Sequence, residues 1–330
     1  NFAADHKRDL DALACYQKAA SMGEPMGLTN LGWCLEAGIG VEANPVQAVL
    51  LYAQAAAMDF VPAITNLGYC YEYGIGVEAD AVNAAAAQKI GLVDRVACAQ
   101  ECIRESDLII LAVPVGAAVR MLPVVLDAFA ELKDTSKIVM DVCSTKEQLA
   151  RAVKYHPCRR QYVASHPMAG TEYSGPWAAM PGLFDGHAGI ICDAEESSPK
   201  AVRSVEKLYE ALNMRTIYMN SSNHDVHTAY VSHVSHVISF ALAQTVLEKE
   251  KDEKHIFDLA SGGFSSTVRL AKSGADMWTP ILLQNSDNVL RVLDTYMDKL
   301  KAFREAIAES DEEAVRALIL EANRIRRIIR

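Results

Sequence analysis

Two stretches near the start of the chain repeat each other at a fixed offset of 36 residues. LGWCLEAGIGVEANPVQA (31–48) and LGYCYEYGIGVEADAVNA (67–84) share a leucine, a glycine, a cysteine, a glutamate and the run Gly-Ile-Gly-Val-Glu-Ala. A period of this size indicates stacked helical hairpins, because each unit buries its apolar face only against its neighbours. Small side chains at repeated positions would let the helices approach closely, and these are Ala19, Gly32, Ala55 and Gly68.

The glycines of these repeats also resemble the first half of a dinucleotide-binding fingerprint. A G-x-G-x-x-G motif should follow a strand and open a helix. Gly74-Ile75-Gly76 instead follows a helical pattern, recurs at the repeat period and has Ala79 where the third glycine belongs. We therefore predict that Gly38 and Gly74 end helices in a left-handed conformation, and that both turns join helix to helix.

In its pattern L-G-x-C-x-E-x-G-x-G-V, the segment over about residues 5–87 resembles the Sel-one-like family of tetratricopeptide-related repeats. The resemblance implies an α-solenoid, which typically serves as a scaffold for a protein partner.

A different pattern begins near residue 85. Short continuous apolar runs alternate with helical periodicity, as is typical of buried parallel strands in a doubly wound α/β sheet. After Ser221, long apolar-periodic stretches with few breakers predict a helical domain. The expected strands are 107–115, 137–142, 162–166 and 188–192, and the expected helical stretches are 116–132, 224–250, 277–307 and 310–329.

Composition narrows the classes of partner and compartment. The net charge of -10 argues against a nucleic-acid or acidic-membrane partner, because no basic surplus exists to neutralise phosphates. No apolar run approaches the ~20 residues that span a bilayer. The eight cysteines lack metal-ligand spacing, so we expect reduced thiols in the cytoplasm.

Polar residues at the expected strand ends point to a ligand site. Ligands of open α/β sheets bind beyond the carboxyl ends of the strands, where Ser144 and His166 stand. A lone histidine is more often structural than catalytic. The Arg269 guanidinium either binds a carboxylate through two hydrogen bonds or forms a salt bridge at the surface. His233 and His236 share a helix face, but no acidic residue or cysteine stands at ligand spacing, so no zinc is expected.

Several spaced motifs, taken in order, resemble the prephenate dehydrogenase family over about residues 83–330. The matching segments are DLIILAVP, DVCSTK, SHPMAGTE, HD-x10-H (224–236) and GGF-x4-R-x8-W (262–278). The resemblance implies oxidative decarboxylation of prephenate, or of its amino analogue arogenate, on the route to tyrosine. It also implies NAD or NADP as cofactor, tyrosine as a further ligand, and a homodimer joined through the helical domain.

The resemblance assigns a role to each matching position. His166 is the general base or hydrogen-bond acceptor for the ring 4-hydroxyl, and Ser144 orients it. Neutral imidazole suits this task, since it takes the hydroxyl proton as hydride leaves the carbinol carbon. The resemblance further implies that Arg269 and His236 hold substrate carboxylates, that Thr171, Gly262 and Trp278 shape the pocket, and that Val113, Pro114 and Ser144 face the cofactor.

The chain departs from the family in its nucleotide-binding half. A ~30-residue unit of strand, glycine loop, helix and second strand is expected first. Family-like sequence begins only at NAAAAQKIGLVD (83–94), and no G-x-G-x-x-G occurs in the chain. In the usual order 3-2-1-4-5-6, the missing first strand would lie beside 107–113 and leave that strand with an open edge.

The sequence is compatible with two functions. One is a prephenate dehydrogenase-like oxidoreductase with a complete substrate half, and the other is a non-catalytic protein-interaction scaffold. We expect an α + α/β architecture of three parts: helical repeats over 1–84, an incomplete Rossmann-like domain over 85–220, and a helical substrate-binding and dimerisation domain over 221–330.

Overall fold

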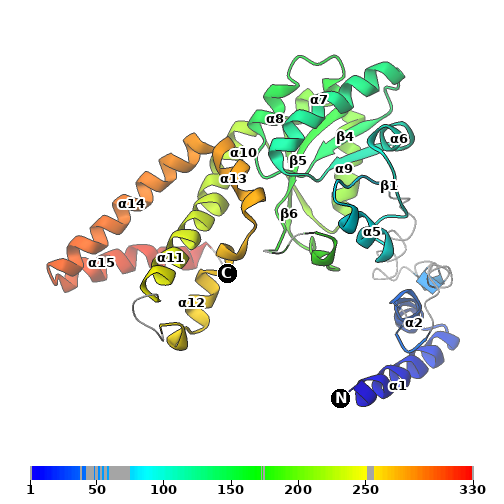
Figure 1. Ribbon diagram of the computed structural model, residues 1–330, viewed down its shortest axis with the longest axis horizontal. Coiled ribbons are helices and arrows are strands. Elements are labelled where there is room, and N and C mark those ends of the chain that lie inside the picture. The colour runs from blue at the N-terminus through cyan, green and yellow to red at the C-terminus, as the bar shows by residue number, and fades with distance from the viewer. Residues whose placement is uncertain are drawn as a thin grey trace. The chain divides into compact units, whose positions relative to one another are not determined.

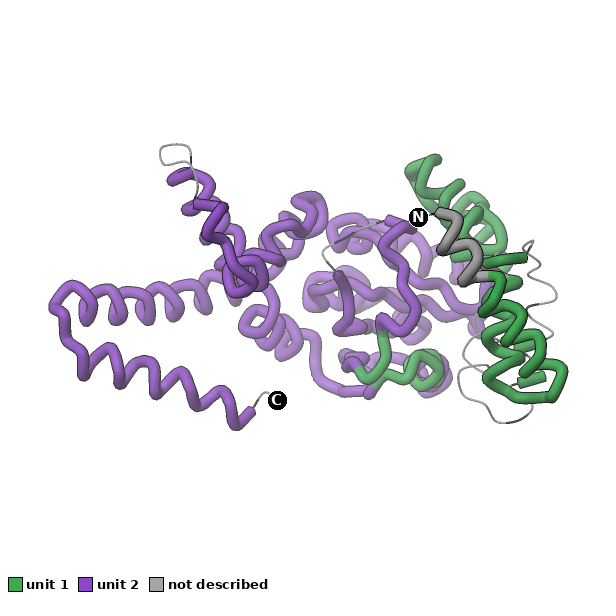
Figure 2. Tube along the Cα trace, turned by 90° about the horizontal axis from the view of Figure 1, so that it is seen from below, with its two compact units in different colours: residues 1–105, 184–186, 207–214 green, residues 106–183, 187–206, 215–330 purple. Residues whose placement is uncertain are grey.

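The computed structural model divides into two units (Figure 2). Unit 1 comprises 1–105, 184–186 and 207–214, and unit 2 comprises 106–183, 187–206 and 215–330. The residues that the structure describes are 2–37, 39–41, 48, 51–52, 54–55, 58, 75–171, 173, 175–250 and 256–328.

Unit 1 begins with a close pair of helices, α1 (Phe2–Ser21) and α2 (Pro25–Ala37). A Cβ atom on Gly32 would lie 2.7 Å from Cε1 of the buried Tyr52. Only a hydrogen fits at this position, so the expected role of Gly32 in close helix packing is confirmed. Gly68, the equivalent position in the second repeat, lies outside the described residues.

The second Gly-Ile-Gly segment contributes to a strand rather than to a helix–helix turn. β1 (Ile75–Gly76) pairs in parallel with β2 (Arg95–Val96), and α5 (Ala81–Lys89) connects the two strands. The prediction that both turns join helix to helix is therefore wrong for the second turn. The two repeats share these residues, and the second copy is followed along the chain by a strand with which it pairs. Gly38 and Gly74 lie outside the described residues.

A short βαβ unit thus begins ahead of the segment at which family-like sequence was expected to start, and its helix α5 overlaps that segment. Asp80 accepts the backbone N–H groups of Val82 and Asn83 at 2.9 and 2.8 Å, so it caps α5. The helix α6 (Ala99–Glu105) completes this part of the chain.

Unit 2 contains a five-stranded sheet of order β3-β4-β5-β6-β7 (Figure 1). Four strands were expected from their apolar runs and are confirmed. β5 and β6 are antiparallel, whereas the other neighbours are parallel. The strands are β3 (Leu108–Leu111), β4 (Ile138–Asp141), β5 (Tyr162–Pro167), β6 (Ala188–Cys192) and β7 (Arg215–Met219).

β3 is the edge strand of this sheet in the described part of the chain. Asp107 and Leu111 accept backbone N–H groups from β4 and its extension through their carbonyl oxygens. Because backbone groups alternate in direction along a strand, those of Leu108 and Ile110 face the opposite edge. The place of β3 at the end of the strand order agrees with the expected open edge at 107–113.

Helices cover the sheet, and α7 (Val115–Leu132) provides much of the core. Its buried residues recur at helical spacing, because one face of the helix packs on the sheet. The other helical segments between β4 and β7 are α8 (Glu147–Ala152), η1 (Arg159–Gln161), η2 (Pro176–Ala178), η3 (Ala194–Glu196) and α9 (Pro199–Ala211). The buried residues of α7 are Val115, Ala118, Leu122, Val125, Leu126 and Phe129.

The rest of unit 2 is helical, as expected. A π-helical turn, η4 (Ala229–His233), interrupts the first long helix between α10 (Ser221–Thr228) and α11 (Val234–Glu250). The elements that follow are η5 (Phe257–Leu259), α12 (Gly262–Thr267), η6 (Arg269–Lys272), α13 (Ala275–Gln284), α14 (Ser286–Ala308), α15 (Glu312–Ala322) and η7 (Asn323–Arg327).

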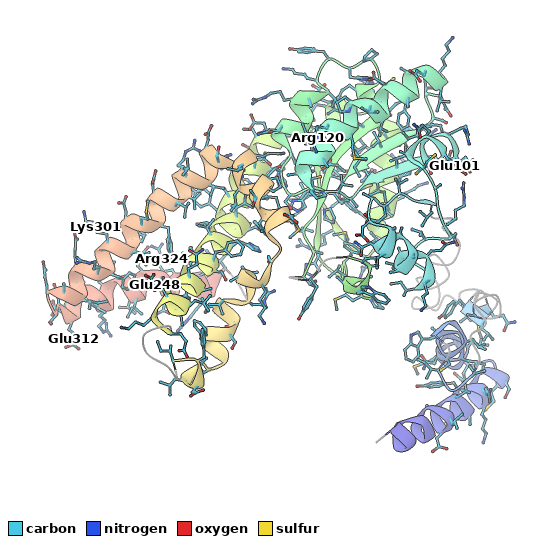
Figure 3. The ribbon with its side chains drawn as sticks, viewed as in Figure 1. Glu101, Arg120, Glu248, Lys301, Glu312 and Arg324 are labelled. Carbon is cyan, nitrogen blue, oxygen red and sulfur yellow. The ribbon has the colours of Figure 1, made fainter. Side chains whose placement is uncertain are left out.

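This helical part buries little of its apolar surface within one chain. Ala229, Val234, Val289 and Val292 form its buried cluster, and α15 has no buried residue. Figure 3 labels charged side chains on α11, α14, α15 and η7. Exposed apolar side chains accompany them: Leu247, Leu283, Leu290, Met297, Leu300, Ile307, Ile319, Leu320 and Ile325. No helix in the described residues has the length and hydropathy required to span a membrane.

Candidate active site

A chain of hydrogen-bonded side chains lies at the carboxyl end of β5. His166, next to last in the strand, has its Nδ1 2.9 Å from Nε2 of His224. The Nδ1 atom of His224 lies 2.7 Å from Oδ1 of Asp225. His224 and Asp225 belong to α10 and are buried, whereas His166 is half-buried. The contact therefore joins the α/β and helical parts of unit 2.

Asp225 also holds the start of α8. Its Oδ1 accepts the backbone N–H of Lys146 at 2.8 Å, and its Oδ2 accepts that of Glu147 at 2.9 Å. The first N–H groups of a helix lack partners within the helix and favour a negative charge. The carboxylate thus caps α8 from another element and is itself held in place.

A buried ion pair fixes the backbone immediately before His166. The Lys146 ammonium, fully buried, donates to the Asp141 carboxylate and to the carbonyl oxygen of Ser165, the latter at 2.7 Å. Asp141 in turn accepts the backbone N–H of Ser165 at 3.2 Å and the hydroxyl of Tyr162 at 2.7 Å. Because each partner is satisfied on several sides, the pair can be buried without an uncompensated charge.

The two site histidines are neutral at pH 7. Burial lowers the pKa of His166 well below its ordinary value, and the neighbouring His224 and Lys146 lower it further. Burial also lowers the pKa of His224, although the hydrogen bond to Asp225 acts in the opposite direction. A neutral imidazole has one N–H donor and one lone pair, which is the state that a proton acceptor requires.

A second group of predicted residues forms an aromatic stack on α11 and α13. The ring of His236 lies on that of Trp278, with centroids 3.4 Å apart and planes at 24°. Nδ1 of His236 contacts the carbonyl oxygen of Ser232 at 3.0 Å. Burial lowers the pKa of His236, and the charge of Arg269 contributes in the same direction. Arg269 itself begins η6 and is exposed.

The other predicted positions take part in no described contact with His166. Ser144 is half-buried between β4 and α8, and its backbone faces His233. The Thr171 hydroxyl accepts the N–H of Tyr173 at 3.3 Å. Gly262 begins α12 and has open space where a Cβ would stand. Val113 accepts a weak contact from Cys143 Sγ at 3.6 Å, and Pro114 occupies the cap position of α7.

Sequence reasoning missed four residues that organise this site. His224 and Asp225 stand at the start of the HD-x10-H motif, and Asp141 and Lys146 are the first and last residues of the DVCSTK motif. Residue chemistry could have indicated them. A carboxylate next to a histidine, and a lysine that closely follows a buried strand, both require polar partners when they are buried. Among the described residues, no group of three histidine, cysteine or carboxylate side chains is placed to hold a metal ion.

Family models match most of the chain. The nucleotide-binding domain of prephenate dehydrogenase matches residues 69–218, and the prephenate dehydrogenase dimerization domain matches residues 220–321. The Sel1 repeat matches residues 5–24 and 25–60. The first match begins before β1, earlier than the sequence motifs suggested.

Curated relatives agree with these family models. The chain is 32% identical over 213 residues to the cyclohexadienyl dehydrogenase of Zymomonas mobilis. The matched region covers 64% of this chain and 71% of that protein. It is 30% identical over 232 residues to the prephenate dehydrogenase of Bacillus subtilis, and this matched region covers 70% of this chain and 62% of that protein. The chain thus spans less than two thirds of the Bacillus subtilis enzyme.

Solved structures share the fold. The prephenate dehydrogenase of Aquifex aeolicus, in complex with hydroxyphenyl propionate and NAD+, superposes with a TM-score of 0.70 at 24% identity and covers 81% of this chain and 93% of its own. The Synechocystis arogenate dehydrogenase superposes with a TM-score of 0.58 at 22% identity, over 76% of this chain and 89% of its own.

Proposed function

Because the chain belongs to the prephenate dehydrogenase family, we propose that its histidine site binds a prephenate-like or arogenate-like carboxylate and accepts the proton of the ring hydroxyl. The observation that supports this most strongly is the hydrogen-bonded series His166–His224–Asp225 at the carboxyl end of β5. The reaction class expected for the family is oxidative decarboxylation, which converts prephenate into 4-hydroxyphenylpyruvate.

His166 has the chemistry of the proton acceptor in this proposal. Hydride can leave the carbinol carbon only as the hydroxyl proton departs, and a neutral imidazole within hydrogen-bond reach accepts that proton. The lowered pKa of His166 keeps its imidazole neutral at pH 7. Aromatisation drives the loss of CO2, so the remaining task of the protein is to orient a dianion.

Arg269, His236 and Trp278 supply that orientation in the proposal. A guanidinium pairs with a carboxylate through two parallel hydrogen bonds. The half-buried ring of His236, stacked on Trp278, would offer an aromatic surface to a six-membered ring bearing carboxylates.

NAD or NADP, the cofactor expected from the family, would act as hydride acceptor. The residues present do not fit its pyrophosphate, because no G-x-G-x-x-G follows a strand in the 330 residues. Asp80, just beyond the carboxyl end of β1, already caps α5. We expect turnover of prephenate with NAD far below the ~10 per second that is typical of enzymes. A rate near that value would show that another segment binds the nucleotide.

Calorimetric titration of prephenate into three variants tests the substrate assignment. Arg269→Ala should cost about 2–5 kcal/mol of binding free energy, because the anion loses a charge-assisted partner. His166→Asn should cost much less, since His166 acts on the hydroxyl in the transition state. Arg324→Ala, on the exposed η7, is the matched control and should bind as the unchanged chain does. Equal losses for Arg269→Ala and His166→Asn would contradict these roles.

A homodimer accords with the matched dimerization domain and with the exposed apolar residues of α11, α14 and α15. These side chains are the surface that a second copy would cover. We further propose a cytoplasmic location, because the scattered spacing of the eight cysteines is typical of reduced thiols in that compartment.

A second candidate function belongs to the N-terminal repeats, which we propose bind a protein partner. The supporting observation is that Trp33 of α2 is 51% exposed and that Met26, two turns earlier in the same helix, is also exposed, since exposed apolar patches mark interaction sites. Photo-crosslinking from position 33 in cells should yield a partner that crosslinking from the exposed Tyr155 does not. The same products from both positions would contradict a specific partner site.

A further inference from the structure

The hydrogen bonds of Asp225 define the protonation of the ring beside it. Oδ1 accepts the Lys146 N–H and lies 2.7 Å from Nδ1 of His224, and Oδ2 accepts the Glu147 N–H. An ionised carboxylate only accepts hydrogen bonds. Nδ1 of His224 must therefore carry the hydrogen, and because the ring is neutral, its Nε2 has the lone pair.

The lone pair on His224 in turn fixes the position of the hydrogen on His166. Nε2 of His224 lies 2.9 Å from Nδ1 of His166, and a lone pair on the first atom requires a hydrogen on the second. A neutral His166 then carries its lone pair on Nε2. We infer that Asp225 is a positioning residue that acts through His224 to fix the tautomer in which Nε2 of His166 accepts the substrate proton. This inference rests on the proposed role of His166.

Both ends of this series are held by one residue. The Lys146 backbone N–H binds Asp225, while its ammonium group binds the carbonyl oxygen of Ser165, which precedes His166. Asn285 adds a third support, because its Nδ2 donates to the Asp225 carbonyl oxygen at 2.7 Å. The rings therefore cannot rotate independently of the frame that holds the carboxylate.

The charges around the rings favour the neutral forms on which the tautomer depends. The titratable and charged groups facing them are Lys146, Asp141, Asp225 and His233. The Lys146 ammonium opposes a proton on either ring, while Asp225 is bonded directly only to His224. Asp225 thus orients the hydrogen on His224 without placing a negative charge against His166.

A purely structural cap is the alternative explanation. Asp225 would then serve only the N-terminus of α8, and the tautomer of His166 would not depend on it. The two explanations differ in a spectroscopic signature rather than in stability, because both predict that loss of Asp225 destabilises the fold.

Long-range 1H–15N NMR of the chain with 15N-labelled histidine distinguishes them, since it reports which ring nitrogen carries hydrogen without substrate or cofactor. In the unchanged chain, His166 and His224 should both show the hydrogen on Nδ1. In Asp225→Asn, the amide group donates to His224 Nδ1, and the tautomer ratio of His166 should shift toward the Nε2–H form by at least ~10-fold. His227→Gln, exposed on the same helix, should change neither ring.

A second pair of variants keeps the test decisive if Asp225→Asn does not fold. His224→Gln offers an amide oxygen to His166 Nδ1 and should preserve its tautomer, whereas His224→Leu offers no acceptor and should release it. An Nε2–H tautomer of His166 in the unchanged chain, or the same tautomer in the Gln and Leu variants, would overturn the inference. Failure of prephenate to bind, with the tautomers as stated, would contradict the proposed function alone.

Discussion

His233 should make the stability of unit 2 depend on pH. It ends the π-helical turn η4, is 1% exposed, and stands edge-on to Trp278 with ring centroids 5.9 Å apart. Asn285 Nδ2 donates to its Nδ1 at 3.1 Å. Burial lowers the pKa of His233 from 6.5 to about 4, against the opposing charge of Asp225.

The sign and size of the effect follow from proton linkage. Above pH ~6.5 His233 is neutral in both the folded and the unfolded chain and contributes no difference. As the pH falls below this value, the unfolded chain takes up a proton that the folded chain refuses until about pH 4, so stability is lost. The slope is about 1.4 kcal/mol per pH unit, and the full loss is roughly 3 kcal/mol.

Trp278 provides a local probe of this unfolding. The chain has three tryptophans, so Trp33→Phe and Trp177→Phe leave Trp278 as the single fluorophore. Urea unfolding should show that the unchanged background loses about 2 kcal/mol more than its His233→Gln derivative between about pH 6.5 and about pH 5. His166, His224 and His236 contribute to both chains and cancel in the difference. Equal losses in the two chains would show that His233 does not cause the pH dependence.

Three further predictions concern the core, the ion pair and assembly. Leu122→Ala, at a fully buried position of α7, should cost about 2–5 kcal/mol in urea unfolding, whereas an equal midpoint would contradict its place in the core. Lys146→Met should cost about 3–5 kcal/mol because Asp141 is left charged and buried, and adding Asp141→Leu should recover part of that loss; no recovery would contradict the paired burial. Light scattering at tens of micromolar should give twice the chain mass of 36.0 kDa, whereas a monomer would contradict coverage of the apolar helical surface.

The sequence predicted those parts of the fold in which one physical requirement dominates. The apolar run 137–142 became β4, with every residue buried, because a central parallel strand is covered on both faces. β7 (Arg215–Met219) was missed because its residues are only partly buried, as suits an edge strand. β1 was missed because its residues also satisfy the helical repeat, and only pairing with β2 distinguishes the two.

In the candidate site, too, the sequence predicted residues with a local signal and missed those that depend on distant contacts. His166 was predicted from its place at a strand end, where ligands of α/β sheets bind. Its partner His224 is separated from it by 58 residues, and no local pattern indicates which of several histidines makes that contact. The buried pair of Asp141 and Lys146 likewise depends on packing that brings Ser165 between them. Long-range polar contacts of this kind follow from the folded chain rather than from periodicity.

We propose that the substrate half of the site binds its ligand without a cofactor, whereas the nucleotide half lacks a phosphate-binding loop. The calorimetric affinity of prephenate for the chain, with and without saturating NAD, tests this proposal. We predict one binding site per chain in the absence of NAD, and the same affinity in its presence. No binding by the folded chain, or binding only when NAD is present, would contradict the claim.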